Sequence, residues 1–95
     1  MTGTTRSSEG LDVRRRRLLF RSWHRGTREM DLIMGRFADA MIGELSEAEI
    51  DEFEWLSEQP EPDLYAWITS DRPVPPEHDT GVFQKLRSFA RREGK

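Results

Sequence analysis

The side chains that could carry out chemistry are few and far apart in this sequence. It has no cysteine, and its two histidines, His24 and His78, are separated by more than half of the chain. The absence of cysteine excludes disulfides, thiolate metal sites and a cysteine nucleophile, and no pair of histidines has the spacing of helical zinc ligands. The sequence also lacks a Gly-x-Ser-x-Gly elbow, a phosphate-binding glycine loop and a dinucleotide fingerprint. We therefore predict a protein that is not an enzyme, with no catalytic residue, no metal site and no stably bound cofactor.

One short segment, from Ser22 to Asp31, could instead form a polar contact surface. It contains the pattern Arg25-Gly26-x-x-Glu29. By itself this pattern fits the start of a helix, because a carboxylate in the first helical turn complements the helix dipole. A partner protein could use the same residues, since glycine lets another backbone approach closely and Arg25 and Glu29 offer opposite charges.

Three neighbours of this pattern, Trp23, His24 and Arg28, are further candidates for contact with a partner. Most of the other aromatic residues fall at the spacing expected for the core of a helical protein. Trp23 differs from them, because nothing in the sequence around it requires burial. His24 is expected at the surface, beside a turn at Gly26.

Charge is distributed unevenly along the chain. Residues 1–36 hold nine arginines and four acidic residues (+5), residues 37–81 hold one arginine and thirteen acidic residues (−12), and residues 82–95 carry +4, which together give the net charge of −3. Such an uneven distribution of charge favours binding to a defined, charged partner. Neutralisation within one small fold explains the same pattern equally well, because charge distribution speaks to association and not to fold.

The run Arg14–Arg17, followed by Arg21, raises the alternative of nucleic-acid binding, because arginine attracts phosphates. Against it, the chain is acidic overall, and no aromatic residues are interleaved within the run Arg14–Arg17 for base stacking. Four consecutive arginines also surround a helix and form no single stripe. We favour a solvated face that docks an acidic protein surface. The alternative function is a small regulatory protein whose basic first helix binds nucleic acid or a toxin partner.

Apolar residues recur at helical spacing, and no segment shows the alternation typical of a strand. Turn and capping signals mark the helix boundaries: Gly26, Gly43, the capping box Ser46–Glu49, Pro62, and Asp79 or Thr80. The first two expected helices cover Leu11–Ser22 and Thr27–Ile42. The third begins at Ser46 and ends before Pro60, and the fourth begins around Pro62 and ends before the loop Asp71–Pro76. The fifth reaches Arg92. The sequence thus predicts an all-α fold, a compact five-helix bundle.

We expect a single domain over residues 11–92, preceded by a disordered polar arm (1–10) and followed by a tail (93–95). The apolar stripes Met30–Met41, Ile50–Leu56 and Val82–Phe89 should meet in one small core. No apolar run approaches the ~18 residues that span a bilayer, and the first ten residues lack the apolar stretch of a secretory signal. Direct insertion into a membrane is therefore not expected.

Three motifs in order resemble the family of succinate dehydrogenase FAD assembly factors. Members carry an Arg-Gly-x-x-Glu signature between their first two helices, and Arg25-Gly26-x-x-Glu29 matches it after the basic segment. Phe53-Glu54-x-Leu56 resembles the family's Tyr/Phe-Glu-x-Leu-Leu, and Asp63–Ile68 resembles its Asp-Leu-Tyr-x-Trp-Ile box. The likeness extends over about residues 11–70. Ser57 replaces a usual leucine and Glu61 a frequent aspartate, two departures that lie away from the signature.

The resemblance implies a five-helix protein that is cytoplasmic in bacteria, or in the mitochondrial matrix if the source is eukaryotic. It implies that the protein binds a client, the flavoprotein subunit of succinate dehydrogenase, and in some bacteria also that of fumarate reductase. It further implies that the protein promotes the covalent bond between FAD and a histidine of the client. Carried over by position, Arg25, Gly26 and Glu29 would contact the client. The client and its flavin supply the chemistry, so the helper need only favour the client conformation that places them correctly.

Overall fold

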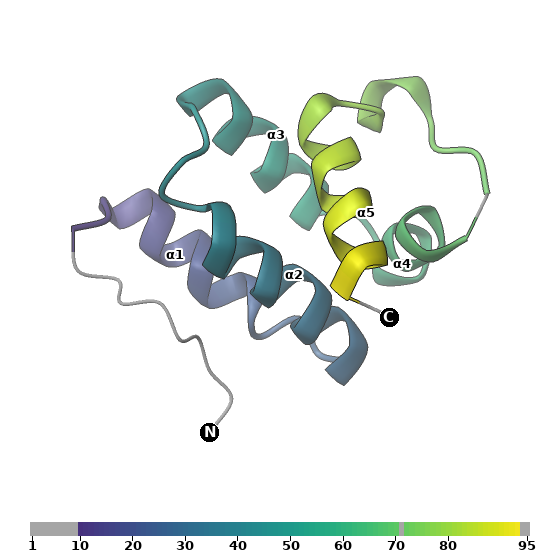
Figure 1. Cartoon of the computed structure of the whole chain (residues 1–95), viewed down its shortest axis with the longest axis horizontal. Coiled ribbons are helices and arrows are strands. Elements are labelled where there is room, and N and C mark those ends of the chain that lie inside the picture. The colour runs from purple at the N-terminus through teal and green to yellow at the C-terminus, as the bar shows by residue number, and fades with distance from the viewer. Residues whose placement is uncertain (1–9, 71, 94–95) are drawn as a thin grey trace. The chain divides into compact units, whose positions relative to one another are not determined.

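The structure, a computed structural model, describes residues 10–70 and 72–93, and over these residues the protein is helical (Figure 1). No described residue lies in a β-strand, so the predicted all-α class is confirmed. The predicted arm, except Gly10, and the last two residues of the tail lie outside the described residues. The elements are α1 (Val13–Ser22), α2 (Arg28–Met41), α3 (Glu47–Ser57), α4 (Glu61–Thr69), the short 3-10 helix η1 (Pro76–His78) and α5 (Gly81–Glu93).

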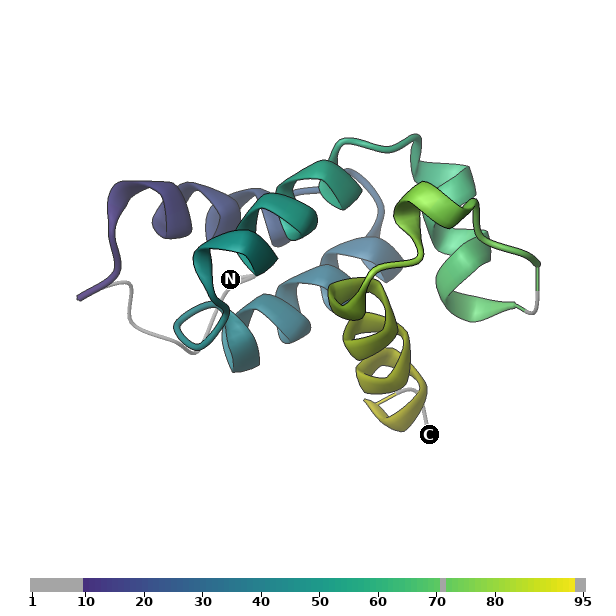
Figure 2. The same cartoon turned by 90° about the horizontal axis from the view of Figure 1, so that it is seen from above.

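The chain divides into two compact units, residues 1–46 and residues 47–95. In the N-terminal unit α1 packs against α2, and the two helices lie side by side in both views (Figure 1 and Figure 2). Its buried apolar side chains are Leu18, Leu19, Trp23, Met30, Met34, Phe37, Ala38, Ile42 and Leu45. On each helix they recur at spacings of mostly one, three or four residues, which is why each segment forms an amphipathic helix. A single domain with one common core stays a prediction.

Both helices of the N-terminal unit begin with a side-chain cap. The Asp12 carboxylate accepts a hydrogen bond from the backbone N–H of Arg15 at 2.8 Å. The Thr27 hydroxyl accepts one from the backbone N–H of Met30 at 3.3 Å. These caps satisfy amides that have no partner inside the helix. The second helix therefore begins about where it was predicted, whereas the first begins two residues later, at Val13.

The sequence placed the C-terminal cap of α2 at Gly43, and a glycine in such a cap usually has the left-handed conformation. Among the described glycines, only Gly10 and Gly26 have a positive φ. Ile42 occupies the cap position in a helical conformation, and its carbonyl accepts a 2.7 Å hydrogen bond from Arg15 Nη1. The last carbonyls of a helix lack internal partners and carry partial negative charge. A guanidinium from α1 therefore satisfies the end of α2.

Arg15 is expected to stabilise the protein, unlike its neighbours Arg16 and Arg17. Its side chain is only 13% exposed and also pairs with Asp12 at 3.4 Å, which corrects the interpretation of the whole arginine run as solvated. Arg15→Ala should lower the free energy of unfolding by about 1.5–3 kcal/mol, the usual value of a hydrogen bond to a charged group. Arg16→Ala and Arg17→Ala, at exposed positions, should each change it by less than about 0.5 kcal/mol. Urea unfolding of the three variants makes the comparison, and equal effects would contradict the capping role.

In the C-terminal unit α5 packs against both α3 and α4. Two predicted boundary signals are confirmed. Pro62 lies in the first turn of α4, and the Thr80 hydroxyl accepts a hydrogen bond from the backbone N–H of Phe83 at 3.1 Å at the start of α5. The buried apolar side chains of this unit are Ile50, Phe53, Leu56, Leu64, Trp67, Ile68, Val82, Phe83 and Leu86.

The loop before α5 ends in a buried histidine that the sequence did not predict. The His78 ring stacks on Trp67 of α4, with 5.3 Å between ring centroids, and lies 4.5 Å from the Trp55 ring of α3. Its Nδ1 atom is buried, with no hydrogen-bond partner within the described part of the chain. His78 therefore acts by its ring, which holds the loop against α3 and α4.

Candidate partner-binding turn

The predicted contact residues lie on the turn that joins α1 to α2. After α1 the chain turns at Gly26, which has a φ of +118°. L side chains rarely adopt this conformation, so the path of the turn requires glycine. A Cβ atom at Gly26 would meet no atom within 4 Å. One side of the turn is therefore open, and a partner's backbone could approach it closely.

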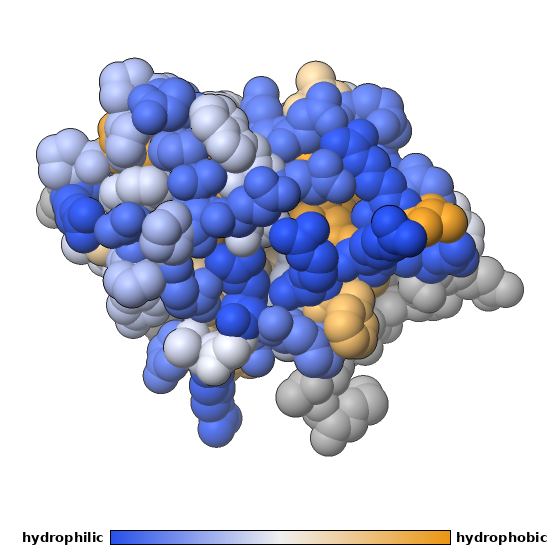
Figure 3. Space-filling view, turned by 180° about the vertical axis from the view of Figure 1, so that it is seen from behind, coloured by the Kyte–Doolittle hydropathy of each residue, from blue (hydrophilic) through white to orange (hydrophobic). Residues whose placement is uncertain are grey.

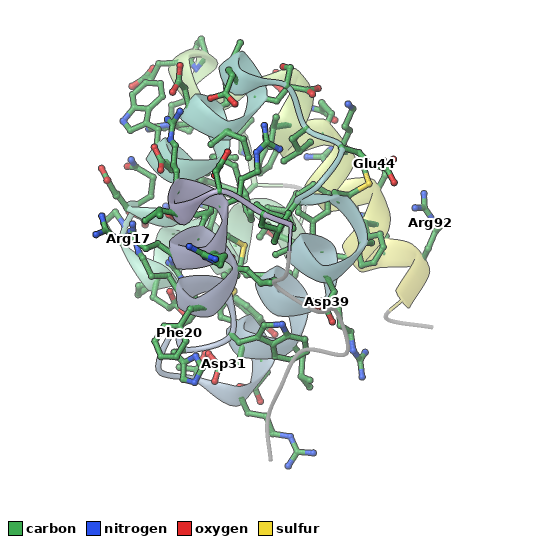
Figure 4. The ribbon with its side chains drawn as sticks, turned by 90° about the vertical axis from the view of Figure 1, so that its left-hand side faces the viewer. Arg17, Phe20, Asp31, Asp39, Glu44 and Arg92 are labelled. Carbon is green, nitrogen blue, oxygen red and sulfur yellow. The ribbon has the colours of Figure 1, made fainter. Side chains whose placement is uncertain are left out.

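Asp31, from the first turn of α2, holds this turn in place. Its Oδ1 atom accepts hydrogen bonds from the backbone N–H groups of Arg25 and Gly26, the second at 3.3 Å. The sequence analysis assigned Asp31 no role. The capping box places its acidic residue three positions after the cap, whereas Asp31 lies four positions after Thr27, so no local signal identified it. Figure 4 shows Asp31 beside the turn between the two helices. The turn is thus preorganised by a residue just outside the predicted signature.

Replacing Asp31 tests this arrangement directly. Asp31→Ala removes the shared acceptor, so the amides of Arg25 and Gly26 should exchange with solvent about tenfold faster, which corresponds to about 1.4 kcal/mol of lost protection. Asp31→Asn keeps an oxygen at the same place and should retain most of the protection. Hydrogen exchange followed by NMR gives both rates. Unchanged exchange in Asp31→Ala would show that the carboxylate does not hold the turn.

The remaining predicted residues surround the turn. Arg25 is half-buried, whereas His24, Arg28 and Glu29 are exposed. Arg28 and Glu29 lie in the first turn of α2, where Glu29 complements the helix dipole as expected. The structure therefore brings Arg25, Gly26, Arg28 and Glu29 together as a polar, mostly accessible surface of mixed charge. Their contact with a partner stays a prediction.

Trp23, whose burial the sequence did not require, is only 9% exposed. Its ring covers Gly35 on α2, where a Cβ atom would come within 2.6 Å of three indole carbons. The indole N–H points to the Asp39 carboxylate at 3.4 Å. Trp23 thus anchors the turn to α2, and it can influence a partner by fixing the position of the turn.

Gly35→Ala should destabilise the protein because the added methyl group would overlap the Trp23 ring. Overpacking of this kind costs about 1–3 kcal/mol. Gly81→Ala is the matched control, since a Cβ at Gly81 meets nothing within 4 Å and its φ is not positive. That control should be neutral or stabilising by up to about 1 kcal/mol. Thermal unfolding compares the two, and an equally mild effect at Gly35 would contradict the packing of Trp23.

His24 stacks on Phe20, an exposed aromatic residue that the sequence analysis did not single out. The two rings are 4.0 Å apart between centroids and inclined by 16°. His24 Nδ1 lies 2.8 Å from the backbone carbonyl of Phe20. A carbonyl only accepts hydrogen bonds, so Nδ1 carries the proton and Nε2 is left for other interactions. His24 is at the surface, as predicted, but its ring is fixed.

The polar groups of the turn are partly engaged within it: the Asp31 carboxylate accepts backbone N–H groups, and His24 Nδ1 lies at hydrogen-bond distance from the Phe20 carbonyl. Within residues 10–70 and 72–93 no three His, Asp or Glu side chains are grouped so that they could hold a metal ion. In the same ranges no helix is both long and apolar enough to cross a membrane. The geometry thus defines a class: a small helical protein with a preorganised polar turn between its first two helices.

Comparison with known proteins makes this class specific. Residues 16–90 match the family described as flavinator of succinate dehydrogenase. This match covers more than half of the chain, and the chain therefore belongs to the flavinator of succinate dehydrogenase family. The resemblance recognised from the three sequence motifs is confirmed.

Individual relatives agree with the family. The mitochondrial succinate dehydrogenase assembly factor 2 of Scheffersomyces stipitis is 34% identical over 90 residues, which are 95% of this chain and 60% of that protein. The protein of the same name from Debaryomyces hansenii is 39% identical over 81 residues, 85% of this chain and 57% of that protein. The FAD assembly factor SdhE of Acetobacter pasteurianus is 35% identical over 80 residues, 84% of this chain and 73% of that protein. The chain thus spans less than two thirds of the two mitochondrial proteins.

Proposed function

We propose that this protein binds the flavoprotein subunit of succinate dehydrogenase and promotes covalent attachment of FAD to that subunit. Where the organism also has fumarate reductase, its flavoprotein subunit is a second client. Membership of the flavinator family carries this proposal. The names of the relatives support it, since one is called a succinate dehydrogenase assembly factor and another an FAD assembly factor.

The polar groups of the turn suggest which steps belong to the protein and which belong to its client. A fixed turn with an open glycine and exposed charges can bind a protein surface, and in this proposal it takes no part in bond formation. The client histidine and the flavin therefore provide the reacting atoms, and the helper selects the client conformation in which they meet. In this proposal the protein is not an enzyme, and it carries no FAD of its own.

The contact surface in this proposal is centred on Arg25, Gly26 and Glu29, with His24 and Arg28 beside them. Gly26 provides the close approach, since its open side meets no atom within 4 Å. Arg25 and Glu29 contribute opposite charges to a polar rim, which sets the orientation of the partner more than the affinity. Trp23 and Asp31 act behind this surface by fixing the turn.

The proposed location follows the named relatives, which include a bacterial protein and mitochondrial proteins. We expect the protein in the cytoplasm if its source is a bacterium and in the mitochondrial matrix if its source is a eukaryote.

Coexpression of the protein with the flavoprotein subunit of its own organism, in a host that lacks any FAD assembly factor, tests the proposal. Covalent flavin is measured by in-gel fluorescence of the subunit, and immunoblotting of the same gel gives the amount of subunit. We expect strong flavin fluorescence with the protein and weak fluorescence without it, at equal amounts of subunit. Equal fluorescence in both strains would reject the proposed function, and flavin bound to the purified helper itself would reject its proposed lack of FAD.

A further inference from the structure

One side of α1 presents apolar and basic side chains to solvent. Val13, Arg17 and Phe20 follow one another at spacings of four and three residues, so they share one face of the helix. Arg16 borders this face, and His24 continues it beyond the helix end by stacking on Phe20. We call these five residues the α1 strip. Phe20 is 63% exposed and Val13 is 53% exposed, and Figure 4 shows Arg17 and Phe20 on the same side of α1.

The Phe20 ring is held in one position, which distinguishes it from an ordinary exposed apolar side chain. Its ring stacks on His24 at 4.0 Å, and the His24 ring is itself fixed by the hydrogen bond from Nδ1 to the Phe20 carbonyl. A side chain that is already ordered loses little conformational entropy when a partner covers it. Rigid aromatic residues of this kind serve as anchors at the centre of protein interfaces. The stack therefore favours an anchoring role for Phe20.

The charges beside Phe20 indicate the chemistry of the surface that it meets. Arg16 and Arg17 are exposed, and neither side chain forms an ion pair with another described residue. Figure 3, seen from the side opposite to Figure 1, shows hydrophobic areas that are small and separated by hydrophilic side chains. Positively charged groups around one apolar anchor are complementary to an acidic surface with an apolar pocket. Two copies of the α1 strip would repel each other, which disfavours self-association through this face.

We propose that the α1 strip docks on an acidic surface of the client flavoprotein, with Phe20 inserted in an apolar pocket of that surface. The inference rests on the proposed function and extends its contact surface from the turn along α1. The strip is continuous with the turn, because His24 stands next to Arg25. A protein occupant is favoured over nucleic acid because Phe20 is the only exposed aromatic anchor on described α1, whereas single strands are bound by several stacked aromatics.

Binding of the full chain to the purified flavoprotein subunit, measured by isothermal titration calorimetry, tests this inference. Phe20→Ala should weaken binding at least about tenfold, as truncation of an interface anchor does. Tyr65→Ala is the matched control, since Tyr65 is 41% exposed but lies on α4, and it should change binding by less than about twofold. Arg17→Ala should weaken binding at low salt and make it less dependent on salt, because a rim charge acts mainly through screened attraction.

Gly26→Arg, a change in the turn, separates failure of this inference from failure of the proposed function. If the unmodified protein does not bind the flavoprotein, the proposed function fails. If it binds and Gly26→Arg abolishes binding while Phe20→Ala binds normally, only the α1 strip is wrong. An equal loss in Tyr65→Ala would also overturn the inference.

Two further measurements examine other occupants of the strip. Fluorescence anisotropy with RNA and duplex DNA at physiological salt should show no tight binding, and sedimentation equilibrium should show a monomer. Tight nucleic-acid binding that Phe20→Ala removes would overturn the proposal, and so would a dimer that Phe20→Ala dissociates.

Discussion

Gly26→Arg is expected to yield a folded protein that no longer supports flavin attachment to the client. Any L residue at a φ of +118° is strained, at a cost of about 1–3 kcal/mol, which is smaller than the stability of a typical domain. The arginine side chain also fills the open side of the turn, so the client backbone cannot approach. Gly26→Ala is the matched control, because it brings the same backbone strain with a methyl group that meets nothing within 4 Å.

The decisive measurement combines thermal unfolding of both variants with the covalent flavin that each supports on the coexpressed flavoprotein. We expect similar unfolding temperatures, with flavin attachment largely lost in Gly26→Arg and largely kept in Gly26→Ala. An equal loss of flavin attachment in both variants would mean that client binding depends on the backbone conformation of the turn and not on its open side. Full flavin attachment in Gly26→Arg would show that the turn is only the start of α2. Arg25→Ala and Glu29→Ala test the charged contacts in the same assay.

Phe37→Ala is expected to destabilise the protein by about 3–5 kcal/mol, the usual cost of removing a buried aromatic ring. Phe37 is fully buried on α2, whereas Phe20 on α1 is exposed. Phe20→Ala removes the same atoms and should change the free energy of unfolding by less than about 0.5 kcal/mol. Chemical unfolding followed by circular dichroism measures both. A small effect of Phe37→Ala would contradict the assignment of the core, and a large effect of Phe20→Ala would make it unsuitable for binding experiments.

The sequence predicted the buried face of α2 correctly, but not every residue of the predicted apolar stripe is fully buried. Met30, Met34 and Phe37 are fully buried, as the helical spacing predicted. Ile33 and Met41 are only half-buried, because they stand at the border of the apolar face. Ile33→Ala should therefore cost less than the 2–5 kcal/mol of a fully buried site.

Helices and their starts could be predicted because local signals determine them. The caps at Thr27 and Thr80 and the proline at position 62 act within one turn of the chain. Gly43 shows where this reasoning fails. A glycine after a helix is compatible with a left-handed cap, but it does not require one when a guanidinium from another helix satisfies the last carbonyl.

The parts of the site that the sequence did not predict depend on contacts between α1, α2 and the turn. Arg15 looked like one member of a solvated run, and only the packing of α1 on α2 places its guanidinium at the Ile42 carbonyl. The pairing of Trp23 with Gly35 likewise joins residues from two helices. Asp31 was visible within the motif, but its role depends on the turn folding back toward α2. Local patterns identified the turn, and tertiary contacts explain its rigidity.

The placement of the three tryptophans gives the protein its own optical reporters. Trp23 belongs to the N-terminal unit, whereas Trp55 and Trp67 belong to the C-terminal unit, where both rings contact His78. A variant that keeps only Trp23 would report, through the emission of a buried indole, on the packing behind the turn. A variant that keeps only Trp67 would report on the packing of α4 against the His78 ring that stacks on it. Fluorescence alone could then follow the order in which the two units lose their structure, without any added dye.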